Sequence, residues 1–163
     1  MFKPIAFFLV FSLYLIAPAA SANIQKPVVV SLDLITDDPV DDMIDRAYEL
    51  LGTPYRQGGI SDTQGFDCSG FLVYLFKTEA NIHIPRTTAA MQRSTAATVK
   101  RSALQPGDAV FFRGNGRGQV NHVGLYIGEG RFIHSPRSGK SVRIDSLANQ
   151  YWSRHYSTAR RFH

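Results

Sequence analysis

The feature that most limits the fold of this chain is a change in its apolar pattern near residue 109. Before that point, apolar side chains recur every three or four residues, the spacing that places them on one face of a helix. After it, short apolar runs alternate with glycine-containing turns, which is the pattern of strands joined as hairpins. Helices followed by a run of strands predict an α+β fold, with N-terminal helices packed on an antiparallel sheet.

Local signals set the expected boundaries of these elements. The first helix begins at Pro39, after an aspartate cap, and ends at Gly52. Helices are expected over residues 39–51, 68 to about 80, and 89 to about 97. Strands are expected over residues 109–112, 122–127, 131–135, 142–144 and 158–162. A chain of 163 residues with this content suits a single domain, which we place at residues 37–163.

Residues 1–22 have the composition of a secretory signal peptide. Lys3 supplies the positive start, an apolar core follows over residues 5–16, and Ala20-Ser21-Ala22 forms a cleavage site. The apolar stretch is short for a membrane span. We therefore expect a mature chain that starts at Asn23, with a lead segment over residues 23–36. It should be soluble, periplasmic or secreted, and free of lipid, because no cysteine lies near the cleavage site.

The charge balance argues against a nucleic-acid partner. Eighteen basic and thirteen acidic residues give a net charge of +5, without any run of five or six lysines or arginines. Such a balance is typical of a solvated surface.

Cys68 is the only cysteine, and it stands between turn residues and an apolar run. Gly65 and Gly70 permit a tight turn and the close approach of another backbone. This arrangement predicts a loop that delivers a thiol to the first turn of a buried helix, where the helix dipole favours thiolate. A buried structural cysteine is the alternative. An unpaired thiol in an oxidising compartment has to be either buried or used, which favours a functional role.

Two of the five histidines are placed to serve such a thiol. His122 opens one expected strand and His134 lies in the next, so a hairpin would bring them together on one face of the sheet. A thiolate hydrolase needs a base and a third group that holds the base. Two ordinary strand histidines are the alternative. Zinc ligation by Cys68, His122 and His134 fits poorly, because structural zinc sites usually contain closely spaced ligand pairs; we expect no metal and no cofactor.

Six motifs in order resemble the NlpC/P60 family of cell-wall peptidases, in its small single-domain Gram-negative form. They are Tyr55 with Gly58-Gly59, Asp67-Cys68-Ser69-Gly70-Phe71, Pro85-Arg86, Pro106-Gly107-Asp108 with Phe111-Phe112, His122 to Gly128, and Phe132-Ile133-His134. The similarity extends from about Val40 to Arg161. It implies a papain-like α+β core and a catalytic domain over residues 37–163.

The resemblance also implies an activity and a site. It implies a murein endopeptidase that hydrolyses peptidoglycan stem peptides through a thioester acyl-enzyme. We expect a monomer without an integral membrane span. Cys68 would be the nucleophile, His122 the base and His134 the third member of the triad. Substrate-binding or oxyanion roles would fall to Tyr55, Asp67, Ser69 and Arg86. Unlike lipoprotein members of the family, this chain has no lipid-bearing cysteine, and it has no wall-binding repeat.

Other functions on the same scaffold stay open from the sequence alone. One is different thiol acyl chemistry, in an amidase, an acyltransferase or an antibacterial effector. Another is a catalytically silent protein that binds the cell wall. The sequence also leaves open whether the bond between D-glutamate and diaminopimelate or a D-alanine cross-link is cut.

Overall fold

A computed structural model describes residues 38–114 and 118–163 of the chain. The predicted signal peptide and the lead segment lie outside the described residues. Within the described ranges, no helix is both long enough and apolar enough to cross a membrane.

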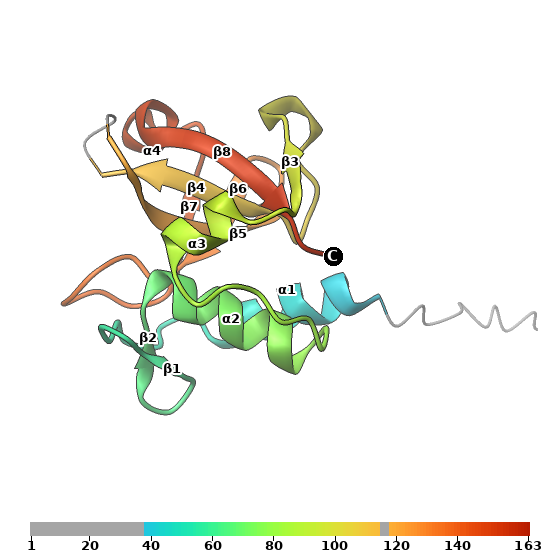
Figure 1. Cartoon of the computed structure of the whole chain (residues 1–163). Helices are drawn as coiled ribbons and strands as arrows, with labels where there is room; N and C mark the ends of the chain where they lie inside the picture. Colours follow the sequence, from blue (N-terminus) through green and yellow to red (C-terminus); the bar gives the residue numbers. More distant parts are fainter. Residues whose placement is uncertain (1–37, 115–117) are drawn as a thin grey trace, which may run out of the picture. The chain divides into compact units, whose positions relative to one another are not determined.

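Most of the described strands form one six-stranded antiparallel sheet, in the order β3-β8-β4-β5-β6-β7 (Figure 1). Their bounds are β3 Ala97–Val99, β4 Ala109–Arg113, β5 Val120–Gly128, β6 Arg131–His134, β7 Arg143–Ser146 and β8 Tyr156–Arg161. A small two-stranded sheet is formed by β1 (Ile60–Ser61) and β2 (Gly65–Phe66). The helices are α1 Pro39–Glu49, α2 Cys68–Thr78, α3 Thr88–Arg93 and α4 Gln150–His155, with a 3₁₀ turn at Arg101–Ala103. The predicted α+β architecture is confirmed.

The helix boundaries follow from local chemistry. The side chain of Asp38 accepts a hydrogen bond from the N–H of Val40, and Pro39 occupies the first turn of α1, where its missing N–H costs nothing. Past the end of α1, Gly52 adopts a φ of 88°, a left-handed conformation that suits glycine. At α2, the Asp67 side chain caps the helix by accepting from the N–H of Gly70.

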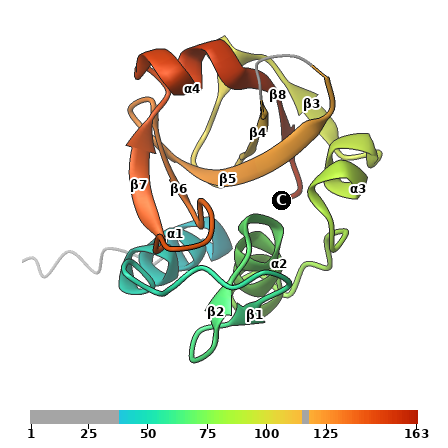
Figure 2. The same cartoon turned by 90° about the vertical axis from the view of Figure 1, so that its left-hand side faces the viewer.

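The sheet carries an apolar cluster on each face. One face packs against α1 and α2, and its buried side chains include Phe71 of α2 and Val123 of β5. The other face packs against α4, whose Trp152 meets Phe112 and Phe132. Figure 2 shows α1 and α2 on one side of β5 and α4 on the other. Since β5 lies near the middle of this sandwich, its first residues stand between the two layers of helices.

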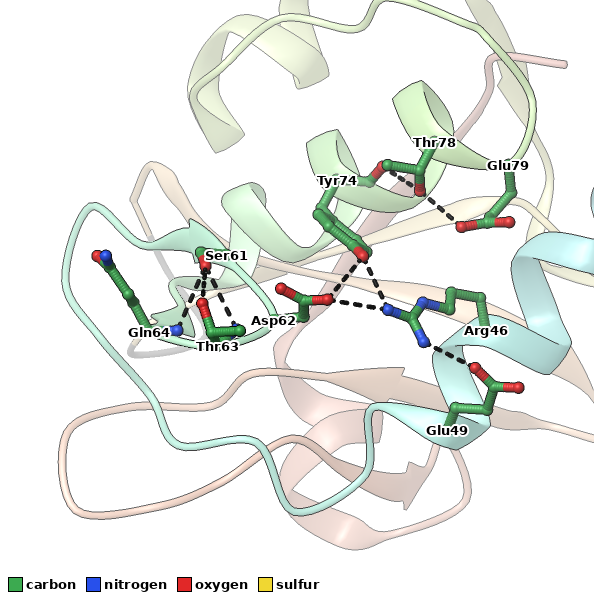
Figure 3. A network of polar contacts seen from close by, with 9 residues as sticks. All are labelled: Arg46, Glu49, Ser61, Asp62, Thr63, Gln64, Tyr74, Thr78 and Glu79. Carbon is green, nitrogen blue, oxygen red and sulfur yellow. Dashed lines mark hydrogen bonds and ion pairs between the residues drawn. The ribbon is translucent and has the colours of Figure 1, made fainter.

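A polar network ties α1 to α2 and to the loop between β1 and β2 (Figure 3). Arg46 of α1 donates to Asp62 at 3.0 Å, to the Tyr74 hydroxyl at 2.9 Å and to Glu49 at 2.7 Å. The Tyr74 hydroxyl in turn donates to Asp62 at 3.1 Å. Partly exposed ion pairs add little free energy, so the main consequence of this network is to fix the orientation of the helix that begins at Cys68.

Three parts of the structure differ from the sequence-based expectation. The third helix ends at Arg93 and not near residue 97, because Ala97–Val99 pairs with β8 as an edge strand. Residues 150–155 form α4, a helix that was not among the expected elements. The short sheet of β1 and β2, between the first two helices, was not predicted.

Candidate active site

Cys68 is the first residue of α2, as predicted, and its thiol lies against β5 and α3. The Thr88 hydroxyl is 3.6 Å from the sulfur. The backbone N–H groups of Val123 and Ser69 also hydrogen-bond to the sulfur. Because Val123 directly follows His122, these contacts place the thiol beside the start of β5.

A network of hydrogen bonds next to the thiol connects Asp67, Ser69 and Arg86. Arg86 donates to both carboxylate oxygens of Asp67, at 3.1 and 2.7 Å, and to the Ser69 hydroxyl at 2.9 Å. Asp67 also accepts from the backbone of Gly58 at 3.0 Å and of Gly70 at 2.6 Å. Burial works to raise the pKa of Asp67, but Arg86 and the Gly70 N–H bring it below its ordinary value. This network anchors the turn that presents Cys68; direct substrate contact by its members stays a prediction.

Glycine is required where α2 meets the preceding loop. A Cβ atom built on Gly70 would lie 2.0 Å from the carbonyl oxygen of Gly59. The close backbone approach expected from the sequence at Gly70 therefore exists, and its partner is Gly59.

His122 and His134 meet on one face of the sheet, but diagonally. The register pairs Leu125 with Ile133, so His134 faces Gly124 and not His122. A Cβ atom on Gly124 would lie 2.6 Å from Phe132 Cδ2 and 3.1 Å from the His134 Cβ, so a side chain at this position would collide with the Phe132 ring. In the space left open, His122 Nε2 lies 2.6 Å from His134 Nδ1.

The chain of contacts continues to Asp145, a residue that sequence reasoning missed. His134 Nε2 lies 2.8 Å from Asp145 Oδ2, and Arg143 donates to the same oxygen at 3.0 and 2.8 Å. His134 is fully buried. Asp145 pairs with Phe132 across the hairpin and reaches His134 on the diagonal. The sequence gives no signal for this contact, because it depends on the registers of two successive hairpins.

These contacts assign the proton positions on both imidazoles. The Asp145 carboxylate accepts, so neutral His134 donates from Nε2 and its Nδ1 is an acceptor. His122 must then donate from Nε2 to His134. The lone pair of His122 is left on Nδ1, the ring nitrogen available to take a proton from a thiol.

The electrostatic environment favours a neutral Cys68 thiol and a neutral His122 imidazole before substrate binds. Burial raises the pKa of the Cys68 thiol above its ordinary value. Burial, with a smaller contribution from His134, also lowers the pKa of His122 to about 3. The sequence-based expectation that the helix dipole would favour thiolate is wrong for this resting state, because the loss of hydration outweighs the dipole.

The orientation of the two histidine rings argues against the alternative of zinc ligation. The Nε2 atom of His122 points at Nδ1 of His134, and the other nitrogen of His134 points at Asp145. Ligands of one metal ion would converge on a common point. Here the ring nitrogens are used in a line of hydrogen bonds.

Tyr55 lies near Cys68 and Asp67. Burial raises the pKa of its hydroxyl, and the neighbouring charges of Cys68 and Asp67 raise it further. The Tyr55 backbone is fixed by a hydrogen bond from its N–H to the carbonyl of Lys140, at 2.8 Å. Of the residues predicted to bind substrate, Tyr55 is the one that shares the electrostatic environment of the thiol without belonging to the Asp67–Arg86 network.

Sequence comparisons relate this chain to known proteins. The profile of the NlpC/P60 family matches residues 52–161. Murein DD-endopeptidase MepH of Escherichia coli is 44% identical over 147 residues, which cover 90% of this chain and 50% of that protein. Gamma-D-glutamyl-L-lysine dipeptidyl-peptidase of Bacillus cereus is 42% identical over 123 residues, covering 75% of this chain and 36% of that protein. The chain spans about half the length of the first curated relatives it matches.

A solved structure extends the likeness to three dimensions. The crystal structure of an NlpC/P60 family protein from Bacillus cereus has a TM-score of 0.71 to this chain at 41% identity, covering 76% of this chain and 40% of that one. The family profile covers well over half of the sequence and includes Cys68, His122 and His134. On this evidence, the chain belongs to the NlpC/P60 family.

Proposed function

We propose that this protein is a cysteine peptidase that hydrolyses the stem peptides of peptidoglycan. The observation that carries the proposal is the line of contacts from His122 through His134 to Asp145, which leaves a lone pair on His122 Nδ1, together with the hydrogen bond from the next residue, Val123, to the Cys68 sulfur. The names of relatives support the substrate, since two of them are murein DD-endopeptidases of Escherichia coli. A catalytically silent wall-binding protein has no use for this ordered line of proton acceptors.

In the proposed mechanism, His122 Nδ1 takes the thiol proton as the sulfur attacks the amide carbonyl. The negative charge on the carbonyl oxygen is stabilised by the backbone N–H of Cys68 and the hydroxyl of Tyr55. The C–N bond breaks when His122 returns the proton to the leaving amine, and the acyl group stays on sulfur as a thioester. Water then gives a proton to His122 and attacks the thioester, which releases the carboxylic acid and restores the thiol.

The bond cut is proposed to be the D-alanine cross-link between stem peptides. The relative that matches 90% of this chain is named for that activity. The Bacillus relative, named for cleavage after γ-D-glutamate, supplies the second candidate. The test is to digest purified sacculi with the protein and to identify the fragments by mass spectrometry. Conversion of cross-linked dimers to monomers is expected. Release of dipeptides would indicate the second bond, and unchanged sacculi would contradict the peptidase.

We propose in addition that residues 1–22 direct secretion and are removed, so that the protein acts in the periplasm or outside the cell without a lipid anchor. The motif Ala20-Ser21-Ala22 supports this. N-terminal sequencing of the secreted protein should begin at Asn23. A mature protein that begins at Met1 would contradict this proposal.

Changing Asp145 to asparagine should lower kcat/KM while the protein stays folded. An asparagine amide can donate to His134 Nε2, which moves the His134 proton to Nδ1 and forces His122 to present a protonated Nδ1 to the thiol. The analogous change in a serine-protease triad costs about 10⁴-fold, and removal of partners that orient a metal-bound histidine costs about 10- to 100-fold. We expect Asp145→Asn to fall in this range, and His134→Ala to lose more than His134→Gln, which keeps an acceptor.

The measurement that is specific to a positioning role of Asp145 is the tautomer of His134, which the ¹⁵N chemical shifts of its ring report. The wild-type ring should carry its proton on Nε2, and the Asp145→Asn ring should carry it on Nδ1. Asp41→Asn, on the exposed face of α1, serves as the control and should change neither activity nor tautomer. Full activity of Asp145→Asn with an unchanged His134 tautomer would show that Asp145 does not act through the two histidines.

A further inference from the structure

A pocket of about 610 Å³ opens beside His122. Its lining includes His122 and Asp145 but neither Cys68 nor Tyr55. The pocket is therefore contiguous with the proton donor of the proposed reaction and separate from the nucleophile.

The position of the pocket indicates which half of the substrate it would hold. In the proposed mechanism the acyl half stays bonded to the Cys68 sulfur, and the amine half departs after it takes a proton from His122. The amine half therefore leaves from the His122 side of the site. A pocket lined by His122 and not by Cys68 is in the right place to hold the residue whose amine is released.

The pocket wall is rich in arginine. Arg113, Arg137 and Arg143 all line it, and Asp145 is the one acidic side chain among the lining residues. Arg143 is paired with Asp145 through two hydrogen bonds. Among the described residues, neither Arg113 nor Arg137 forms an ion pair within 4.0 Å. Two guanidinium groups therefore remain available to a ligand, and guanidinium matches a carboxylate with two parallel hydrogen bonds.

The remaining lining is aromatic. Phe112, Tyr151 and Trp152 contribute rings, and the Trp152 ring stacks on His122 with centroids 5.5 Å apart at an angle of 28°. An aliphatic chain can lie on such a surface. A ligand that satisfies both parts of the wall combines an alkyl chain with a free carboxylate.

We propose that this pocket is the leaving-amine subsite and that it selects an amine-side residue with a free carboxylate on an aliphatic chain. This is the chemistry of a diamino dicarboxylic acid such as diaminopimelate. A lysine, or a diaminopimelate whose free carboxyl group is amidated, lacks the matching charge. The inference rests on the proposed peptidase function, because that function decides which half of the substrate leaves by His122.

The test compares two synthetic stem peptides that share the acyl half and differ on the amine side, which carries diaminopimelate with its free carboxylate or with the carboxamide. The wild-type protein should cleave the carboxylate peptide with a kcat/KM roughly 10- to 100-fold higher, the scale of one charge-assisted pair of hydrogen bonds. Arg137→Gln should remove most of that preference by slowing the carboxylate peptide, and should leave the carboxamide peptide within about two-fold. Arg154→Gln, on α4 outside the pocket lining, makes the same charge change and should keep the full preference.

A binding arm separates failure of this inference from failure of the proposed function. The Cys68→Ala protein is titrated with the free amine-side product, as carboxylate and as carboxamide, with and without Arg137→Gln. Carboxylate-selective binding that Arg137→Gln abolishes would support the subsite even if neither peptide were cleaved, in which case the peptidase proposal alone would fail. Equal cleavage of both peptides, or equal binding of both products, would overturn the subsite.

Discussion

Cys68→Ala should abolish peptidoglycan hydrolysis, with a loss in kcat of at least about 10⁴-fold, because no other group in the site can form the thioester. Cys68→Ser should remain close to the alanine variant. A hydroxyl is far harder to deprotonate than a thiol, and His122, with a pKa of about 3, is a weak base for that task. The assay is the release of soluble fragments from purified sacculi.

The fold should survive both substitutions. The thiol is small, and the structure gives it one side-chain hydrogen bond, to Thr88. A change in the free energy of unfolding of only about 1–2 kcal/mol is therefore expected, measured by denaturant titration. Because Cys68 is the only cysteine, iodoacetamide reports on this site alone: it should block the wild-type enzyme and leave Cys68→Ala unlabelled. Hydrolysis at the wild-type rate by folded Cys68→Ala would show that Cys68 is not the nucleophile.

His122→Ala should be almost as damaging, with a loss of kcat/KM of up to about 10⁴-fold, the upper range for removal of a general base. The effect is large because burial raises the pKa of the thiol, so that the sulfur depends on His122 for its deprotonation. In the proposed mechanism, His122 also supplies the proton for the leaving amine. The alkylation rate of Cys68 should fall together with activity, since both require thiolate.

Two further variants separate the loss of a base from the loss of packing around Trp152. His122→Gln keeps most of the side-chain volume and should be as inactive as His122→Ala. His83→Ala removes an exposed histidine from the loop after α2 and should keep wild-type activity. Added imidazole should partly restore His122→Ala, because the vacated space adjoins the open pocket. A fully active and folded His122→Gln would mean that the base is another group.

Elements that depend on local chemistry could be predicted from the sequence. The start of α1 follows from an aspartate cap and a proline in the first turn, both of which act over three residues. The start of α2 at Cys68 follows from the same logic, with Asp67 as the cap. The long strands β4 and β5 follow from their apolar runs, and packing against neighbouring elements stabilises these strands.

Elements that depend on distant partners could not be predicted. Ala97–Val99 becomes a strand because β8, about sixty residues later, offers it an edge. The role of Asp145 depends on two hairpin registers, and a shift by one residue in either would turn its side chain to the other face. The thiol pKa was misjudged for a related reason: the sequence shows the helix start but not the packing of β5 and α3 that removes water from the sulfur.

The central claim is that the Cys68 sulfur attacks a stem-peptide amide and carries the acyl half as a thioester. The most direct measurement is mass spectrometry of the protein after it is mixed with a soluble stem peptide and quenched in acid within the first turnover. The proteolytic fragment that contains Cys68 should carry an added mass equal to the acyl half, which hydroxylamine removes and which is absent from Cys68→Ala. Cleavage of the peptide at an equal rate by wild-type and Cys68→Ala proteins, without any such adduct, would contradict the central claim.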